Sequence, residues 1–397
     1  MKTARRYLAR EIYRSAAVVV LALIGLFTFF SVVDQLDQVG RGSFKLYHLF
    51  YLEFLALPTR LYDLLPIGLL IGAILGLAGL AQRHELVILR VSGVSGMKLL
   101  RMLWLSSIPV LVGALLLAEF LTPLAELKLS EAKLALRGDA GRSNILRSGY
   151  WFRETNSAGG LRVINVGALR GSHNAAVVTV YDFDQAQELK TLMAAQTATF
   201  EAGKMQLQQV MINTIHPLGN PNDPISPDTK PVEVHSEATH EISTTLTPEL
   251  LLARVLTPER MSFLNLFEYI QYLSDNHLTA DRQIVAVWRK LIYPFTLLVM
   301  IAIAAPLGFV QTRKGGVGTK VFAGILLGVG FFLLNQLSLN IGMLNKWPAW
   351  VTAIVPNAFA LVLAMTALLL MENRNAIALK MARLTGRKPP PPRQAPT

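Results

Sequence analysis

The chain has 397 residues, of which 52% are hydrophobic and only 16% are charged, and its formal net charge is +12. A soluble domain carries about a quarter charged residues, so this composition excludes an ordinary soluble protein and indicates an integral membrane protein. The absence of cysteine excludes disulfides, thiolate metal sites and a cysteine nucleophile. The basic residues flank apolar runs instead of alternating with aromatic residues, which argues against a nucleic-acid partner.

Six apolar runs are long enough to be transmembrane helices, because a hydrocarbon core about 30 Å thick needs roughly 20 apolar residues per helix. In chain order the runs are 16–33, 64–81, 99–121, 284–310, 320–343 and 349–371. No small-residue cleavage site follows the first run, so we expect a retained helix and not a cleaved signal peptide.

Lysine and arginine residues gather in four segments next to these runs. The segments are 1–14, 80–100, 311–320 and 374–397. By the positive-inside rule all four are expected in the cytoplasm, together with both termini. The connections 34–63 and 122–281 then lie on the outer side, and only the second is large.

The large outer connection is expected to be β structure. Stretches rich in β-branched residues, such as YWFRE, GLRVINV, AAVVTVYDFD, TLMAAQTATF and KMQLQQVMINTI, are separated by turn residues. We predict an α+β membrane protein with about six transmembrane helices and a β-sandwich or jellyroll domain between helices three and four. The expected parts are 1–137 and 256–375 for the two transmembrane regions, 138–255 for the β domain, and 376–397 for a basic, proline-rich cytoplasmic tail.

The motifs that would indicate an enzyme are incomplete. GGVGTK lacks the G-x-x-x-x-G-K-[ST] pattern of a phosphate-binding loop and follows no strand. HELVILR has no second histidine four residues after His84, so it is not a zinc-protease motif. His235 and His240 lack carboxylates at ligand spacing. We therefore predict no catalytic residue and no metal site in this chain.

The segment LAQRHELVILRVSGVSGMKLL, between the second and third runs, carries charges in a predicted short helix. Its residues fall on three helical faces, formed by Val87, Val91 and Val94, by Arg83 and Arg90, and by Glu85 and Ser92. Gly93 is expected to end the helix, because a residue without Cβ reaches positive φ at little cost. Taken alone, these residues favour a solvated loop in which Glu85 and Arg90 pair; a helix held by a partner is the alternative.

Three stretches resemble the LptF/LptG family of lipopolysaccharide export permeases. They are VDQLDQVGRGSF after the first run, the LAQRHELVILRVSGVSGMKLL segment, and NQL in the fifth run. The order of six spans with a β domain between the third and fourth extends the resemblance over nearly the whole chain. RYLARE near the N-terminus suits LptF members equally, whereas VDQL…VGRGSF and residues 263–289 look more like LptG, so we favour the LptG branch.

The resemblance implies a membrane subunit of an ATP-binding-cassette transporter in the bacterial inner membrane. Such a subunit extracts lipopolysaccharide and passes it to a periplasmic bridge, with the β-jellyroll domain in the periplasm. The implied partners are an LptF-like permease, two LptB-like ATPase subunits and an LptC-like protein. ATP and magnesium would be bound by the ATPase, so this chain is expected to bind no cofactor and to be no enzyme.

The resemblance also assigns roles to residues of this chain. Segment 82–95 corresponds to a coupling helix that contacts the ATPase, principally through Glu85, with Arg83, His84, Arg90 and Gly93 around it. Spans one and five correspond to lateral gates around a cavity for acyl chains, which here carry Phe27, Phe30, Phe331, Phe332, Asn335 and Gln336. Without the resemblance, the phenylalanines would be read as lipid-facing.

Lipopolysaccharide phosphates are expected to contact basic residues near the outer membrane face. Lys133 matches a family position that contacts these phosphates, and Lys128 and Arg137 are its neighbours. Family members can carry a lysine where this chain has Ser31 and a basic pair where it has Asp37–Gln38. We therefore expect phosphate recognition to be redistributed to two other cations, Arg41 and Lys45. The alternative is that all five are ordinary interfacial charges.

Two further hypotheses remain open on the sequence. A permease of the same architecture could move another amphiphile, such as a lipoprotein. In a different class, a signalling or scaffold protein could bind a ligand through its external β domain, and it would have neither an ATPase partner nor a lipid cavity.

Overall fold

The computed structural model describes most of the chain. The described residues are 2–40, 44–137, 149–156, 159–169, 173–201, 203–215, 232–247, 250–251, 256–309 and 317–372. The chain divides into two compact units. Unit 1 comprises Met1–Phe27, Arg60–Leu117 and Val285–Thr397, and unit 2 comprises Thr28–Thr59 and Ala118–Ile284. Each unit is described by itself below.

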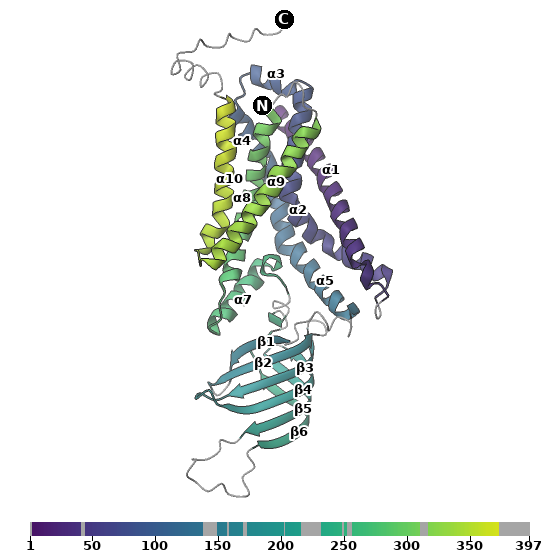
Figure 1. The fold of residues 1–397 in the computed structure, drawn as a ribbon, viewed down its shortest axis with the longest axis vertical. Helices are drawn as coiled ribbons and strands as arrows, with labels where there is room; N and C mark the ends of the chain where they lie inside the picture. Colours follow the sequence, from purple (N-terminus) through teal and green to yellow (C-terminus); the bar gives the residue numbers. More distant parts are fainter. Residues whose placement is uncertain are drawn as a thin grey trace. The chain divides into compact units, whose positions relative to one another are not determined.

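Six helices among the described residues are long and apolar enough to cross a membrane, which confirms the predicted fold class (Figure 1). They are α1 (Lys2–Gln35) with η1 (Leu36–Gln38), α2 (Leu46–Gln82), α4 (Gly96–Leu116) with η2 (Leu117–Leu121) and α5 (Thr122–Arg137), α8 (Asp281–Phe309), α9 (Val317–Leu344) and α10 (Ala349–Glu372). Each helix extends beyond its apolar run, because helical hydrogen bonding continues where the side chains become polar.

Helix α2 is the central helix of unit 1. In its most apolar window 72% of the residues are buried, against 11% in α1 and 17% in α9. Three glycines spaced four apart, Gly68, Gly72 and Gly76, let α1 approach closely. A Cβ atom added at Gly72 would lie 2.3 Å from the Cα atom of Ala16. The contact between α1 and α2 is therefore one of backbone against backbone.

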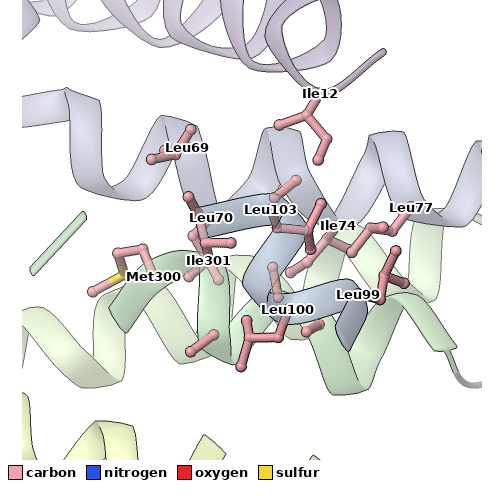
Figure 2. Close-up of a cluster of buried hydrophobic side chains, with 14 of the residues drawn as sticks. Ile12, Leu69, Leu70, Ile74, Leu77, Leu99, Leu100, Leu103, Met300 and Ile301 are labelled. Atoms are coloured by element: carbon pink, nitrogen blue, oxygen red, sulfur yellow. The ribbon is translucent and has the colours of Figure 1, made fainter. Parts of the chain in front are cut away.

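Helices α8 and α9 contact other parts of α2. Helix α9 approaches α2 closely at Gly324, where an added Cβ atom would lie 2.6 Å from Cδ1 of Ile74. Figure 2 shows the apolar cluster that results, with Ile12 from α1, Leu70, Ile74 and Leu77 from α2, Leu99, Leu100 and Leu103 from α4, and Met300 and Ile301 from α8. This cluster is the core of unit 1.

Unit 2 contains one six-stranded antiparallel sheet in which strands adjacent in the sequence are adjacent in space. The strands are β1 (Tyr150–Thr155), β2 (Leu161–Leu169), β3 (Asn174–Phe183), β4 (Leu189–Glu201), β5 (Lys204–Ile215) and β6 (Val232–Ser243). The first five coincide with the predicted stretches. Strand β6 was not predicted, because it is largely exposed and carries polar or charged residues at most positions.

A line of unpaired residues, which we call the crease, crosses strands β2 to β6. It consists of Gly167, Val177, Gln196, Gln209 and Ala238, which face one another in register but form no ladder pairs. Val177 and Gln209 have φ values of 56° and 52°. In β5, Met205 and Leu207 are buried before the crease and Val210 after it, which breaks the two-residue alternation of a regular strand. Both halves of β5 thus place apolar side chains in the core.

A buried ionic network closes one end of the β domain. Arg162 binds Asp182 through two hydrogen bonds of 2.6 and 3.1 Å, and it donates to the carbonyl of Ser243 at 2.8 Å. Glu154, which is also buried, lies 3.4 Å from Arg162 and accepts hydrogen bonds from Thr244 and Thr245. The network ties β1, β2, β3 and the end of β6 together.

Two further elements follow the sheet, η4 (Pro258–Arg260) and α7 (Phe263–Asp275). Arg260 pairs with Glu126 of α5 at 3.0 Å, and the backbone N–H of Phe263 donates to Glu119 at 2.8 Å. The hydroxyl of Tyr272 bonds the backbone of Arg153 in β1. These contacts fix both elements within unit 2. The predicted proline-rich tail 376–397 lies outside the described residues.

Candidate coupling site and lipid-facing residues

Helix α3 (Glu85–Val91) lies between α2 and α4, at the end of unit 1 where α1 begins and α10 ends (Figure 1). Gly96, at the start of α4, lies next to Glu372 and Leu368 at the end of α10. Two of the basic segments defined by the sequence, 1–14 and 80–100, therefore lie at one end of this unit. Helix α3 is shorter than the predicted segment 82–95, because both of its ends are set by residues with positive φ.

His84 makes the sharp turn from α2 into α3. Its φ is 61°, a left-handed conformation that non-glycine residues adopt rarely. Its carbonyl accepts from the N–H groups of Val87 and Ile88 at 3.1 and 3.2 Å, so His84 caps the first turn of α3. The histidine predicted for the ATPase contact thus has a backbone role.

Gly93 ends α3, as predicted, with a φ of 86°. The N–H of Val94 donates to the carbonyl of Leu89 at 3.1 Å, the six-to-one hydrogen bond of a Schellman motif. Val94 and Leu89 both belong to the apolar core of unit 1, which supplies the hydrophobic contact that accompanies this motif. The predicted valine face is corrected here, since Val94 lies beyond the helix and is buried.

The outward face of α3 is apolar. Leu86 is buried in the core, whereas Val87, Ile88 and Val91 are 39%, 66% and 83% exposed. A surface of this kind beside charged residues is typical of an interaction site and not of a solvated loop. The predicted pairing of Glu85 with Arg90 falls outside the described residues, and the described contacts of Glu85 are with Tyr7 and Arg83. The side chain of Arg90 lies outside the described part of the structure.

Charged residues of α1 and of the turn before α3 form a connected cluster. Arg83 binds Glu11 at 2.6 Å and Glu85 at 3.3 Å, and the hydroxyl of Tyr7 donates to Glu85 at 3.2 Å. The hydrogen bond to Glu11 raises the pKa of Arg83, so the guanidinium is charged at any physiological pH. One Glu85 oxygen thus accepts a hydrogen bond from Tyr7 of α1 and pairs with Arg83 of the turn, so α3 is joined to α1 at this point.

Sequence reasoning missed Tyr7 and Glu11. Their positions four apart on one face of α1 were visible, but nothing in the sequence indicated that this face meets residues 83–85. The glycine spacing in α2 indicated a surface for close helix approach, but not which helix occupies it. Gly68, Gly72 and Gly76 place α1 against α2, and Gly79, at the end of the same row, approaches the Glu11 carboxylate.

The residues predicted for lipopolysaccharide lie on elements that pack together in unit 2. Phe44, Leu49, Leu52 and Leu129 form a buried cluster that joins the start of α2 to α5. Lys45 is exposed beside Phe44, and half-buried Lys133 follows Ala132, which packs on the same cluster. Lys128 is exposed on α5. Arg41 and the side chain of Arg137 lie outside the described residues.

Ser31, noted as a departure from the family pattern, belongs to a polar network in unit 2. Its hydroxyl donates to the buried carboxylate of Glu53 at 2.8 Å, and Gln35 donates to the same oxygen at 2.7 Å. Asp37 is exposed in η1 and Gln38 is half-buried. The position of Ser31 therefore faces a carboxylate of α2.

The predicted gate residues lie on the two least buried helices. Phe27, Phe30 and Phe332 are exposed, Gln336 is exposed, and Asn335 is half-buried. Phe331 is the exception, because it packs against the core of unit 1. Helices α1 and α9 thus present large apolar surfaces that other parts of their own unit do not cover. Membrane lipid and the helices of another membrane protein are both suited to cover them.

No group of three or more histidine, cysteine, aspartate or glutamate residues that could hold a metal ion is found within the described ranges. His240 instead pairs with Glu237 at 2.8 Å, and His235 is exposed on β6.

Comparison with known proteins identifies the family. The chain matches the family described as lipopolysaccharide export system permease LptF/LptG over residues 6–370. It is 25% identical over 355 residues to the lipopolysaccharide export system permease protein LptG of Escherichia coli K12, covering 89% of this chain and 94% of that protein. It is 26% identical over 366 residues to the protein of the same name from Haemophilus influenzae, covering 91% and 97%. The chain belongs to the LptF/LptG family of lipopolysaccharide export permeases, and it is a multi-pass protein of the inner membrane.

Proposed function

We propose that this chain is the LptG-type subunit of the export transporter, paired with an LptF-like permease, an LptB-like ATPase dimer and an LptC-like protein. In this arrangement the ATPase binds ATP and magnesium, and this chain carries lipopolysaccharide from the membrane toward a periplasmic bridge. The termini and α3 are cytoplasmic and the β sheet is periplasmic. The positive-inside distribution of lysine and arginine supports this orientation.

The observation that carries the proposal is the outward face of α3. Ile88 and Val91 are 66% and 83% exposed on a seven-residue helix whose two ends are fixed by positive-φ residues. A short helix held rigidly at both ends, with an apolar outward side, is suited to insertion into a groove of a partner protein. Glu85, with its carboxylate held by Tyr7 and Arg83, would supply the polar contact at the edge of this interface.

Because α3 is connected to α1, contact of the ATPase with α3 would also act on a transmembrane helix. Glu85 and Arg83 hold α3 to Tyr7 and Glu11, and α1 is packed backbone to backbone on α2. Displacement of α3 by the ATPase would therefore move α1 as well. Helix α1 carries Phe27 and Phe30, so this displacement would change the shape of the predicted lateral gate.

The proposed lipopolysaccharide site consists of the cations beside the cluster formed by Phe44, Leu49, Leu52 and Leu129. Lys133 and Lys45 flank this cluster from α5 and from the start of α2, and phosphate groups of lipopolysaccharide would bind between them. Lys128, on the exposed side of α5, would add a weaker contact. Ser31 and Gln35 are engaged with Glu53, so they are not assigned to phosphate binding.

The test is co-purification of the ATPase with the Glu85→Ala variant, in cells that express the permease pair and the ATPase together. We expect loss of lipopolysaccharide-stimulated ATP hydrolysis and a reduced yield of ATPase per permease, while the variant remains in the membrane. Glu268→Ala, an exposed glutamate of α7, is the matched control and should behave as the unchanged chain.

Two outcomes would contradict the proposal. If Glu85→Ala retains full association and full stimulation, Glu85 is not at the ATPase interface. If no ATPase co-purifies even with the unchanged chain, the transporter assignment of this subunit fails, and a ligand-binding scaffold takes its place.

A further inference from the structure

A groove of about 480 Å³ lies between the first turns of α1 and the middle of α4 in unit 1. Its α1 side includes Arg5, Arg6 and Tyr13, and its α4 side includes Leu105 and Pro109. A neighbouring hollow of about 550 Å³ shares Arg6 and Tyr13 with it and adds two further arginines of α1, Arg10 and Arg14. None of these residues takes part in the cluster around Glu85.

Among the described residues, the arginines along this groove have no acidic partner. Arg5, Arg6, Arg10 and Arg14 form no ion pair within the part of the chain that the structure describes, whereas Arg83 nearby in unit 1 is paired with Glu11. Arg6, Arg10 and Arg14 are spaced four apart, so like charges stand on one face of the helix. Such a row is destabilising unless anions lie against it.

The α4 side of the groove continues as an apolar strip. Leu105, Ile108 and Val112 are exposed at positions i, i+3 and i+7, so they lie along one face of α4. The hydroxyl of Tyr13 donates to the carbonyl of Ser106, and both residues line the groove. The groove thus combines arginines on its α1 side with an apolar strip on its α4 side, and this combination is complementary to an anionic amphiphile.

We propose that this groove binds an anionic phospholipid of the surrounding membrane, with its phosphate between Arg5 and Arg6 and an acyl chain along the strip of α4. Arginine guanidinium groups bind phosphate in bidentate geometry, and basic pockets between transmembrane helices are typical sites for anionic lipid headgroups. The positive-inside rule places the arginines at the start of α1 on the cytoplasmic side, so the groove serves the cytoplasmic leaflet. This assignment does not depend on the ATPase contact.

The test is native mass spectrometry of the purified full complex, titrated with phosphatidylglycerol or with phosphatidylcholine. We expect saturable binding of phosphatidylglycerol alone, and a loss of roughly five-fold in affinity for each arginine removed in Arg5→Gln and Arg6→Gln. Arg101→Gln, which removes an exposed arginine of α4 that does not line the groove, should change the affinity less than two-fold. Leu105→Trp should obstruct the strip and lower binding with all arginines present.

Four results would overturn the assignment. Phosphatidylcholine could bind equally well, or Arg101→Gln could weaken binding as much as Arg6→Gln, which would mean a diffuse charge effect. Inorganic phosphate or lipopolysaccharide could displace phosphatidylglycerol completely at equal concentration, which would identify another ligand. Binding could also occur only to the isolated chain and not to the full complex, which would show that a partner protein covers the groove.

Discussion

Replacement of Gly72 by alanine should loosen the contact between α1 and α2. The added Cβ atom would lie 2.3 Å from Cα and 2.6 Å from the backbone nitrogen of Ala16. Both distances are about 1 Å shorter than an ordinary carbon contact, and both involve backbone atoms that cannot rotate away. The two helices must therefore separate. We expect the free energy of unfolding to fall by about 1–3 kcal/mol, at the upper end of this range because no side chain can move aside.

Thermal unfolding of the purified chain measures this effect. Gly25→Ala in α1 is the matched control, because an added Cβ atom there meets nothing within 4 Å, and it should leave the transition temperature unchanged or raise it slightly. The double variant Ala16→Gly with Gly72→Ala should remain destabilised, since removal of the Ala16 methyl group leaves the backbone clash. If Gly72→Ala unfolds at the temperature of Gly25→Ala, or if the double variant recovers fully, the packing argument is wrong.

Three further predictions concern the other parts of the molecule. Arg162→Met should lower the free energy of unfolding of the β domain by about 3–5 kcal/mol, because buried Glu154 and half-buried Asp182 would lose their cation. Protease resistance of the domain measures this, and unchanged resistance would contradict it. His84→Gly should be tolerated, whereas His84→Val should lower the free energy of unfolding by about 1–2 kcal/mol, because a β-branched residue disfavours a φ of 61°. Equal melting temperatures of the two variants would contradict the role of the turn. Lys133→Gln should weaken lipopolysaccharide binding several-fold, with exposed Lys190→Gln as control, and equal affinities would remove Lys133 from the lipid site.

The transmembrane part of the fold could be predicted from the sequence because burial in lipid requires long apolar runs, and these are visible without any knowledge of packing. The end of α3 could be predicted at Gly93 for a local reason, its conformational freedom. The turn at His84 could not be predicted, because the sequence gives no sign that a histidine takes a left-handed conformation there. Strand β6 was missed because exposed strands lack the apolar alternation on which strand prediction depends.

The contacts between elements were the least predictable part of the site. Helix α2 carries three glycines four apart, but its sequence does not state whether α1, α8 or α9 occupies that groove. Because α1 occupies it, Glu11 and Tyr7 contact Arg83 and Glu85. In the β domain the crease reverses which residues face the core, so a regular alternation through β5 assigns Val210 to the wrong side.

The central claim is that the outward face of α3 contacts the ATPase. The chain has no cysteine, so a single Val91→Cys substitution carries a photoreactive probe at one defined position. Leu344→Cys, at the end of α9, is the control, because Val91 and Leu344 are both 83% exposed and lie at different ends of unit 1 (Figure 1). We expect light-dependent crosslinking of the ATPase to position 91 and none to position 344. Equal crosslinking at both positions, or none at position 91 in an active complex, would contradict it.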